Sequence, residues 1–412
     1  MKGNRAALAI ACALPLVLAA CGGSSDSGSA SADAGGASEP AAPASSQGAA
    51  PSSDPILIGF PADLSSTYAY YDQPMLEGAQ LAVDELNESG GILGRSVELK
   101  AVDIRNDPAE ATKQTQALID EGAAYLIGST GDVITAEGAL ACQAGVPIST
   151  GDGTAPTLVD DIGDCAFQLL MNDTVQGATA AEYALAQGYQ TAFLIGSPEY
   201  PYTANLPRYF AEIFTAGGGK IVGETTFMIG AGDFSAVVTK VDNADPAPDV
   251  IFTPMFLPDT PVFLRQLRQA GVTTPVISTD GNLDPSLAEA GADALNGLVF
   301  TAPVCLADAD PKIAQFYKTY NARYGGDPSS AIAALGYDEI MMLAAAINSQ
   351  GSAEPEAIKT GLLATKYEGV TGTVEMDPAT RRVKKAAALL KMDGASFTCL
   401  ERVGYPASVP NP

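Results

Sequence analysis

The 412-residue sequence contains no histidine and no tryptophan. The lack of histidine excludes Ser-His-Asp and Cys-His catalysis and the usual zinc sites. Aromatic contacts with a ligand must therefore come from tyrosine or phenylalanine. The sequence also has no G-x-S-x-G elbow, phosphate-binding loop or complete dinucleotide fingerprint. We expect no catalytic residues, no metal site and no cofactor; catalysis by Ser, Asp and Lys is the weakest of the functions considered.

Basic residues are scarce, because 22 Lys and Arg stand against 48 Asp and Glu and give a net charge of −26. Such acidity argues against nucleic acid or an anionic lipid surface as a partner. Beyond the N-terminal segment, no stretch holds eighteen uninterrupted apolar residues, so no transmembrane helix is expected in the rest of the chain.

The N-terminus has the pattern of an export signal. Lys2 and Arg5 precede an apolar stretch that ends at Leu18, and residues 1–20 are predicted to be a lipoprotein signal peptide. The sequence 18–21 resembles a bacterial lipoprotein box, in which Cys21 would be lipidated; the alternative is an ordinary secretory signal. Residues 21–54 are rich in Ser, Ala, Gly and Pro and predict a disordered tether. We expect an exported, membrane-anchored protein on the periplasmic or cell-surface side.

Four cysteines remain in the folded part, and an even number in an exported protein predicts two disulfides. Three pairings are open. We favour Cys142–Cys165, because it would join the helix after one polar turn to the segment after the next. Cys305–Cys399 then follows.

Strands alternate with helices along the chain, which predicts a doubly wound parallel α/β fold. Two polar turns, 128–132 and 149–154, each follow an apolar strand. The carboxyl ends of parallel strands share one edge of a sheet, where α/β folds bind ligands. We therefore expect a small polar solute at these turns.

Ten sequence fragments follow one another in order between residues 55 and 400. They are 72–73, 78–87, 90–95, 106–109, 176–183, 232–235, 263–271, 280–281, 336–338 and 369–372. Together they resemble the branched-chain amino-acid-binding (Leu/Ile/Val-binding) proteins, which are type I periplasmic solute receptors of ABC importers. The resemblance implies two Rossmann-like lobes joined by a hinge: 55–170 with 296–364 as the N-terminal lobe, and 171–295 with 365–405 as the C-terminal lobe.

The resemblance also implies how a ligand is held. Hydroxyls and backbone N–H groups of the first lobe would bind an α-carboxylate, and an acid of the second lobe would bind the α-ammonium. Asp259 matches that acid, and Tyr71 is as good a match as Tyr70 for the first-lobe aromatic. The candidate ligand-binding residues are Tyr70, Ser129, Thr130, Asp132, Thr150, Gly153, Thr154, Tyr200, Asp259 and Asp280.

Each candidate has a simpler interpretation. Asp132 and Asp259 each precede a helix and could only cap it, and Tyr200 could belong to a surface turn. Asp132 and Asp152 also depart from the family pattern, because a carboxylate facing a solute carboxylate costs several kcal/mol when desolvated. Either these two acids point away, or an amide, a polyol or an amine-bearing solute would fit better than an α-amino acid.

The favoured function is a monomeric solute receptor that delivers an amino acid or related small polar solute to an ABC permease in the membrane. The alternative is a sensor that presents the same ligand to a membrane signalling partner, because both functions use closure of the lobes as the signal.

Overall fold

The computed structural model describes residues 54–66, 68–131, 133–283, 287, 292–306, 310–394, 396–402 and 404–412. The predicted signal peptide, the lipidation site Cys21, the tether up to residue 53 and the candidate Asp132 lie outside the described residues. The expectations for them therefore stay predictions. None of the described helices is long and apolar enough to cross a membrane.

The first sheet has five parallel strands in the order β2-β1-β3-β4-β5. β1 is an interior strand, with Ile58 paired to Leu99 on one side and to Tyr125 on the other. Its side chains are almost all buried, as expected for a parallel strand covered on both faces. The strands are β1 (Ile56–Ala62), β2 (Val97–Asp103), β3 (Tyr125–Leu126), β4 (Ile148–Ser149) and β5 (Ala166–Phe167).

The helices of this sheet begin and end at local sequence signals. Asp107 caps α2 by accepting two backbone N–H groups at 2.9 Å, and Pro108 occupies its first turn. Gly145, at a φ of 76°, ends α3. The helices are α1 (Ala69–Glu88), α2 (Pro108–Asp120), α3 (Ile134–Ala144), α4 (Leu158–Ile162), α12 (Ile332–Gln350) and α13 (Pro355–Leu363).

The second sheet has seven strands in the order β15-β14-β10-β9-β8-β6-β7, of which β14 and β15 are antiparallel to their neighbours. The expected α/β class is confirmed. The strands are β6 (Thr191–Gly196), β7 (Lys220–Thr226), β8 (Val250–Phe252), β9 (Val276–Ser278), β10 (Val299–Ala302), β14 (Ala388–Asp393) and β15 (Ser396–Arg402). The helices are α5 (Asp173–Ala186), α6 (Pro201–Ala216), α7 (Ser235–Asp242), α8 (Asp259–Gln269), the 3₁₀ helix η1 (Asp280–Asn282) and α10 (Ala292–Leu295). The later helix α11 (Pro311–Tyr324) contacts α1, where Tyr324 donates its hydroxyl to the carbonyl oxygen of Glu77 at 2.8 Å.

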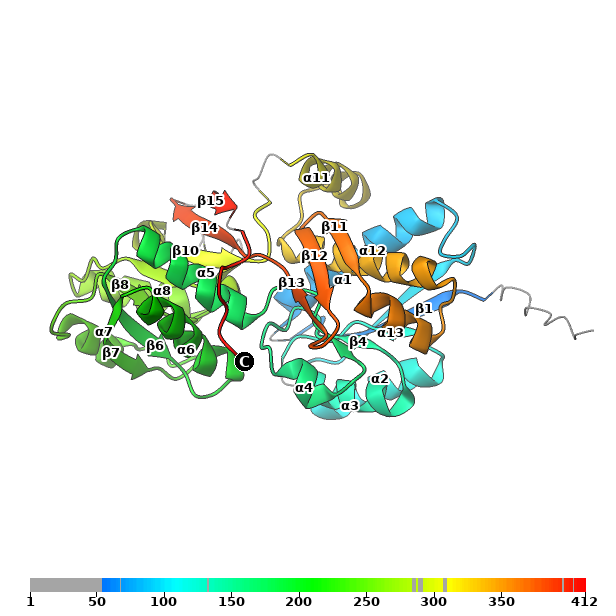
Figure 1. Ribbon diagram of the computed structural model, residues 1–412, viewed down its shortest axis with the longest axis horizontal. Helices are drawn as coiled ribbons and strands as arrows, with labels where there is room; N and C mark the ends of the chain where they lie inside the picture. The colour runs from blue at the N-terminus through cyan, green and yellow to red at the C-terminus, as the bar shows by residue number, and fades with distance from the viewer. Residues whose placement is uncertain are drawn as a thin grey trace, which may run out of the picture. The chain divides into compact units, whose positions relative to one another are not determined.

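The strand order differs from the expected lobe boundaries at two points. β10 belongs to the second sheet, so the chain returns to the first one after residue 302 and not near 296. A third sheet, β11 (Lys366–Gly369), β12 (Gly372–Asp377) and β13 (Arg382–Lys384), packs Val374 and Val383 into the core of the first sheet. Figure 1 shows β11 and β12 beside α12, so the last crossover follows residue 384 and not 365.

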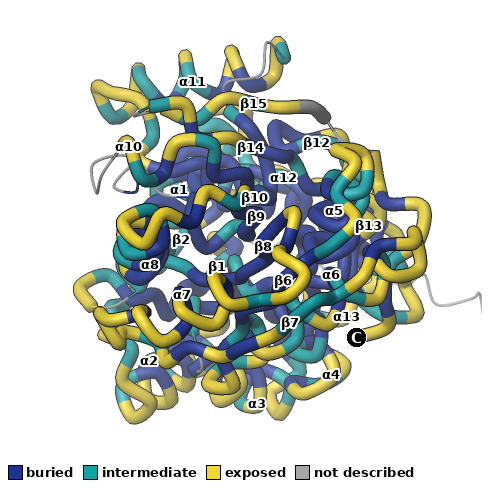
Figure 2. Tube along the Cα trace, turned by 90° about the vertical axis from the view of Figure 1, so that its left-hand side faces the viewer, coloured by how far each residue is buried: buried dark blue, intermediate teal, exposed yellow. Residues whose placement is uncertain are grey.

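The core of the second sheet lies along its central strands, and Figure 2 shows β8 and β9 dark blue between exposed helix surfaces. Phe210 of α6 stacks on Phe252 of β8 with ring centroids 4.4 Å apart. Both side chains are fully buried. Burial of side chains of this size stabilises the fold by roughly 2 to 3 kcal/mol each and fixes α6 on the sheet.

α1 and α12 pack with almost no space between their backbones. A Cβ atom added to Gly78 would lie 1.7 Å from the carbonyl oxygen of Ala333. A Cβ atom added to Gly336 would lie 2.0 Å from the carbonyl oxygen of Met75. The two glycines therefore allow the contact that joins a late helix to the first helix of the chain.

Within the described residues two disulfides are present, Cys142–Cys165 and Cys305–Cys399, as the sequence predicted. The first ties α3 to the residue before β5. The second ties the segment after β10 to β15 at the edge of the seven-stranded sheet.

Candidate functional site

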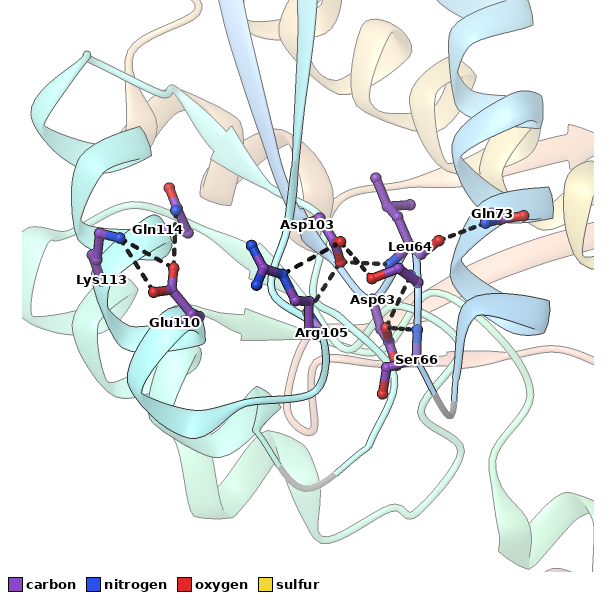
Figure 3. Close-up of polar contacts among 10 residues, drawn as sticks. Asp63, Leu64, Ser66, Gln73, Asp103, Arg105, Glu110, Lys113 and Gln114 are labelled. Carbon is purple, nitrogen blue, oxygen red and sulfur yellow. Dashed lines mark hydrogen bonds and ion pairs between the residues drawn. The ribbon is translucent and has the colours of Figure 1, made fainter.

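The turn after β1 is built around two carboxylates, shown in Figure 3. Asp63 accepts the backbone N–H groups of Ser66 and Tyr68 at 2.8 Å each. Asp103, at the end of β2, accepts the backbone N–H of Leu64 at 3.1 Å. These bonds satisfy backbone N–H groups of the loop that leads into α1 and fix the position at which the helix begins.

Asp72 of α1 joins this turn to the turn after β3. Its Oδ2 atom accepts the backbone N–H of Asp63 at 2.7 Å, and its Oδ1 atom accepts the backbone N–H of Thr130 at 3.1 Å. The carboxyl is buried, and burial raises its pKa well above the usual value. Asp72 thus holds two strand ends of the first sheet together.

Thr130 lies between two carboxyl groups. Its hydroxyl oxygen is within hydrogen-bond distance of Asp72 Oδ1 and of Asp152 Oδ1. A hydroxyl has one hydrogen to donate, so one of the two carboxyls must itself carry a proton if both bonds are made. Burial, with a smaller contribution from the charge of Asp280, raises the pKa of Asp152 to about 7.

The other candidate hydroxyls of the first sheet are engaged with the protein. Ser129 donates its hydroxyl to Glu137 at 2.7 Å and its backbone N–H to the same carboxyl at 3.1 Å. Thr150 donates to the carbonyl oxygen of Gly153 at 3.0 Å. Neither Ser129 nor Thr150 lines the cavity described below. Burial raises the pKa of Glu137 to about 8, so this carboxyl keeps its proton at neutral pH.

Thr154 lies against a further buried acid. The pKa of Asp173 is raised well above its usual value by burial and by the charge of Asp280, and the Thr154 hydroxyl opposes that shift. Asp173 Oδ2 is buried and has no hydrogen-bond partner within the described residues. Asp173 thus lies beside the turn that follows β4 as a carboxyl group whose neutral form burial favours.

On the second sheet, the start of α6 and the end of β9 provide the polar groups. Tyr202 donates its hydroxyl to Asp280 Oδ1 at 2.8 Å and accepts the backbone N–H of Gly281 at 3.1 Å. Burial raises the pKa of Asp280 to about 6, and the bond from Tyr202 opposes that shift. From the first sheet, the Tyr71 hydroxyl reaches the carbonyl oxygen of Gly281 at 3.5 Å.

These groups surround a cavity of about 350 Å³. It is bounded by residues that follow β3 and β4 of the first sheet and by residues of α6 and η1 beside the second. Its lining includes Tyr68, Tyr71, Thr130, Asp152, Gly153, Thr154, Tyr200, Tyr202, Phe256 and Asp280. The cavity therefore lies where the sequence placed a solute, at the carboxyl ends of parallel strands.

Five of the ten candidate residues line this cavity: Thr130, Gly153, Thr154, Tyr200 and Asp280. Asp259 does not, because its carboxylate accepts the backbone N–H of Gly230 at 2.7 Å at the start of α8. Tyr70 does not, and its neighbour Tyr71 takes that place. The acid that reaches the cavity from the second sheet is therefore Asp280.

Sequence reasoning missed Asp72, Tyr68, Tyr202 and Phe256. The position of Tyr202 could have been predicted, because a proline such as Pro201 favours the first position of a helix and the next residue then lies on the first turn. For Asp72 the sequence contains no such indication beyond its place in a fragment that resembles the family, because its hydrogen-bond partners are 9 and 58 residues away.

The comparison with known families decides where the chain belongs. A model described as periplasmic binding protein matches residues 55–396. The chain is a member of this family. The resemblance found in the sequence is thereby confirmed, and the family is one of solute-binding proteins.

Relatives of known name support the same assignment for this periplasmic binding protein. The Leu/Ile/Val-binding protein BraC3 of Rhizobium johnstonii is 29% identical over 317 residues, which cover 74% of this chain and 83% of the relative. The Leu/Ile/Val-binding protein of Escherichia coli is 26% identical over 319 residues, covering 76% and 84%.

Solved structures share the fold. The leucine-binding protein LivK of Thermotoga maritima is 27% identical with a TM-score of 0.76, covering 85% of this chain and 99% of its own. The branched-chain amino acid transporter substrate-binding protein LivJ of Streptococcus pneumoniae, solved with isoleucine, is 28% identical with a TM-score of 0.74, covering 84% and 99%.

Proposed function

We propose that this periplasmic binding protein is the solute receptor of an ABC importer and holds one small organic solute in the cavity between its two large sheets. The observation that carries the proposal is that Thr130, Asp152 and Thr154 from the first sheet line the same cavity as Tyr202 and Asp280 from the second. The names of the relatives, Leu/Ile/Val-binding proteins, support an amino acid or a related small molecule as the solute.

The solute is released unchanged. The sequence has no histidine to activate a nucleophile. The Thr130 hydroxyl, which lines the cavity, lies between Asp72 and Asp152. Burial raises the pKa of both carboxyl groups, so this pair retains protons and does not act as the base that would remove the hydroxyl proton. The polar groups therefore serve recognition.

The receptor acts as a monomer, delivers the solute to a membrane permease and is tethered by a lipid on Cys21 through the segment 22–54. This part of the proposal rests on the sequence. Mass spectrometry of the mature N-terminus tests it: a diacylated Cys21 is expected, and a free N-terminus at another residue would contradict it. Cys21→Ser should release the protein from the membrane fraction.

The central test is isothermal titration of refolded, ligand-free protein against amino acids, amines, amides and polyols. One class should bind with one solute per chain, and native mass spectrometry of unrefolded protein should show the co-purified solute. Absence of binding in all classes together with no co-purified solute would overturn the proposed function.

A further inference from the structure

The cavity has acids on both sides and no basic side chain among its described lining residues. Asp152 follows β4 of the first sheet, and Asp280 follows β9 of the second. Both carboxyl groups line the same cavity, and the charge of Asp280 contributes to the raised pKa of Asp152. Two carboxylates in a desolvated space repel each other unless a cation or a proton lies between them.

Several of the groups that could receive a solute carboxylate at the turns after β3 and β4 are occupied. Three candidate hydroxyls, those of Ser129, Thr130 and Thr150, already donate to protein acceptors. The backbone N–H groups of Ser129 and Thr130 donate to Glu137 and Asp72. A carboxylate placed at these turns would meet Asp152, a hydrogen-bond acceptor, at the point where it needs donors.

Asp173 is a further buried carboxyl group beside the lining residue Thr154. Its Oδ2 atom is buried without a hydrogen-bond partner in the described part of the chain, and it belongs to the acid that lies against Thr154. A buried carboxyl group without a counter-charge is held in its neutral form, and a cation bound nearby favours its ionised form.

Aromatic rings form much of the rest of the lining. Tyr68 and Tyr71 come from the first sheet's side, and Tyr200, Tyr202 and Phe256 come from the second. Ring faces attract cations, and the attraction is stronger where water is excluded. Carboxylates and ring faces together are the groups that recognise an organic ammonium ion.

We propose that the solute is a small organic cation whose ammonium group lies between Asp152 and Asp280, and that it brings no carboxylate to the turns of the first sheet. This inference rests on the proposed function and specifies the class of solute. It separates this chain from receptors that hold the carboxylate of an α-amino acid with hydroxyl and N–H donors.

The test uses a series of probes derived from leucine. Isoamylamine is leucine without its carboxylate, 4-methylpentanoate is leucine without its ammonium group, and 4-methylpentanamide is a neutral amide of the same shape; choline supplies an ammonium ion that donates no N–H bond. Titration calorimetry on the refolded mature chain should show isoamylamine or choline binding at least tenfold more tightly than leucine and at least a hundredfold more tightly than 4-methylpentanoate.

Asp280→Asn and Asp152→Asn should each weaken binding of the ammonium probe at least tenfold. Asp242→Asn is the matched control, because it removes the same charge from the exposed end of α7 and should change affinity less than twofold. If circular dichroism shows that a variant does not fold, the affinities of the unaltered protein for the probe series still test the inference.

Tighter binding of leucine, 4-methylpentanoate or the amide than of both ammonium probes would overturn this inference and leave the proposed receptor function intact. Equal affinity in the Asp280→Asn variant would also overturn it. If nothing in the series binds and no solute co-purifies, the receptor function itself fails.

Discussion

Tyr202 donates its hydroxyl to Asp280 at 2.8 Å, so a residue at the start of α6 orients the carboxylate that enters the cavity from the second sheet. The same hydroxyl oxygen accepts the Gly281 N–H, which ties η1 to α6. The hydroxyl favours the ionised form of Asp280 and opposes the effect of burial.

Tyr202→Phe should therefore weaken solute binding by about 1 to 3 kcal/mol, the usual cost of leaving a buried polar group without its partner. Isothermal titration with the bound solute measures it. Tyr209→Phe is the control, because Tyr209 lies in the same helix, is buried and does not line the cavity. Equal losses in both variants would show that the effect comes from α6 packing and not from Asp280.

The position of the cavity was predictable from the sequence, because it follows from strands that end in polar turns. Thr130, Gly153 and Thr154 line it for that reason. The direction of individual side chains was not predictable. Ser129 points to Glu137, eight residues later, because one turn of α3 brings that carboxyl under the loop.

Which of two similar residues faces the cavity could be decided only from the structure, and this applies to two pairs. Tyr70 and Tyr71 are adjacent, and only the rotation of α1 decides that Tyr71 faces the cavity. Asp259 and Asp280 lie in the segments that follow neighbouring strands. Asp259 is held by the Gly230 N–H, a contact 29 residues away in sequence that no local pattern reveals.

The contact between α1 and α12 should be highly sensitive to added volume. Gly78→Ala places a methyl group 1.7 Å from a backbone oxygen of α12, which cannot move aside as a flexible side chain would. We expect the free energy of unfolding to fall by about 3 kcal/mol, at the upper end of overpacking effects. Urea denaturation followed by circular dichroism measures this change. Gly326→Ala is the control, since its added Cβ meets nothing within 4 Å, and a similar loss there would contradict the packing explanation.

The buried acids make stability depend on pH in a definite direction. Burial raises the pKa of Glu137 to about 8 from a usual value of 4.5, so between these values the folded chain holds a proton that the unfolded chain lacks. The free energy of unfolding should therefore fall as pH rises from about 5 to 8, by up to about 1.4 kcal/mol per pH unit for each such group. Glu339, with its pKa raised to about 7, contributes with the same sign.

Glu137→Gln should make this slope shallower, because glutamine keeps an acceptor for Ser129 and cannot titrate. Urea denaturation at pH 5, 6.5 and 8 gives the slope for both proteins. A stability that rises with pH over this range, or an unchanged slope in the variant, would show that Glu137 is ionised in the folded protein.

Solute binding should depend on pH in the opposite direction. A cation binds the ionised carboxylates, and burial raises the pKa of Asp152 to about 7 and that of Asp280 to about 6. The other titratable groups that interact with these two are Tyr71, Tyr202 and the buried Asp72 and Asp173, whose pKa values are also raised. At pH 5 protons occupy the sites that the ammonium group needs, whereas at pH 8 the solute displaces them.

The affinity for isoamylamine should therefore rise at least tenfold from pH 5 to pH 8, while the amine itself stays protonated throughout because its pKa resembles that of lysine. Choline, whose charge does not titrate, should show the same dependence of affinity on pH, which assigns the dependence to the protein.

Asp152→Asn should remove the part of the rise in affinity near pH 7 and leave the part near pH 6 that belongs to Asp280. Calorimetry in buffers of different ionisation enthalpy counts the protons released on binding. Affinity that instead increases on acidification would indicate a solute carboxylate received by protonated acids, because only then does a proton on Asp152 help binding.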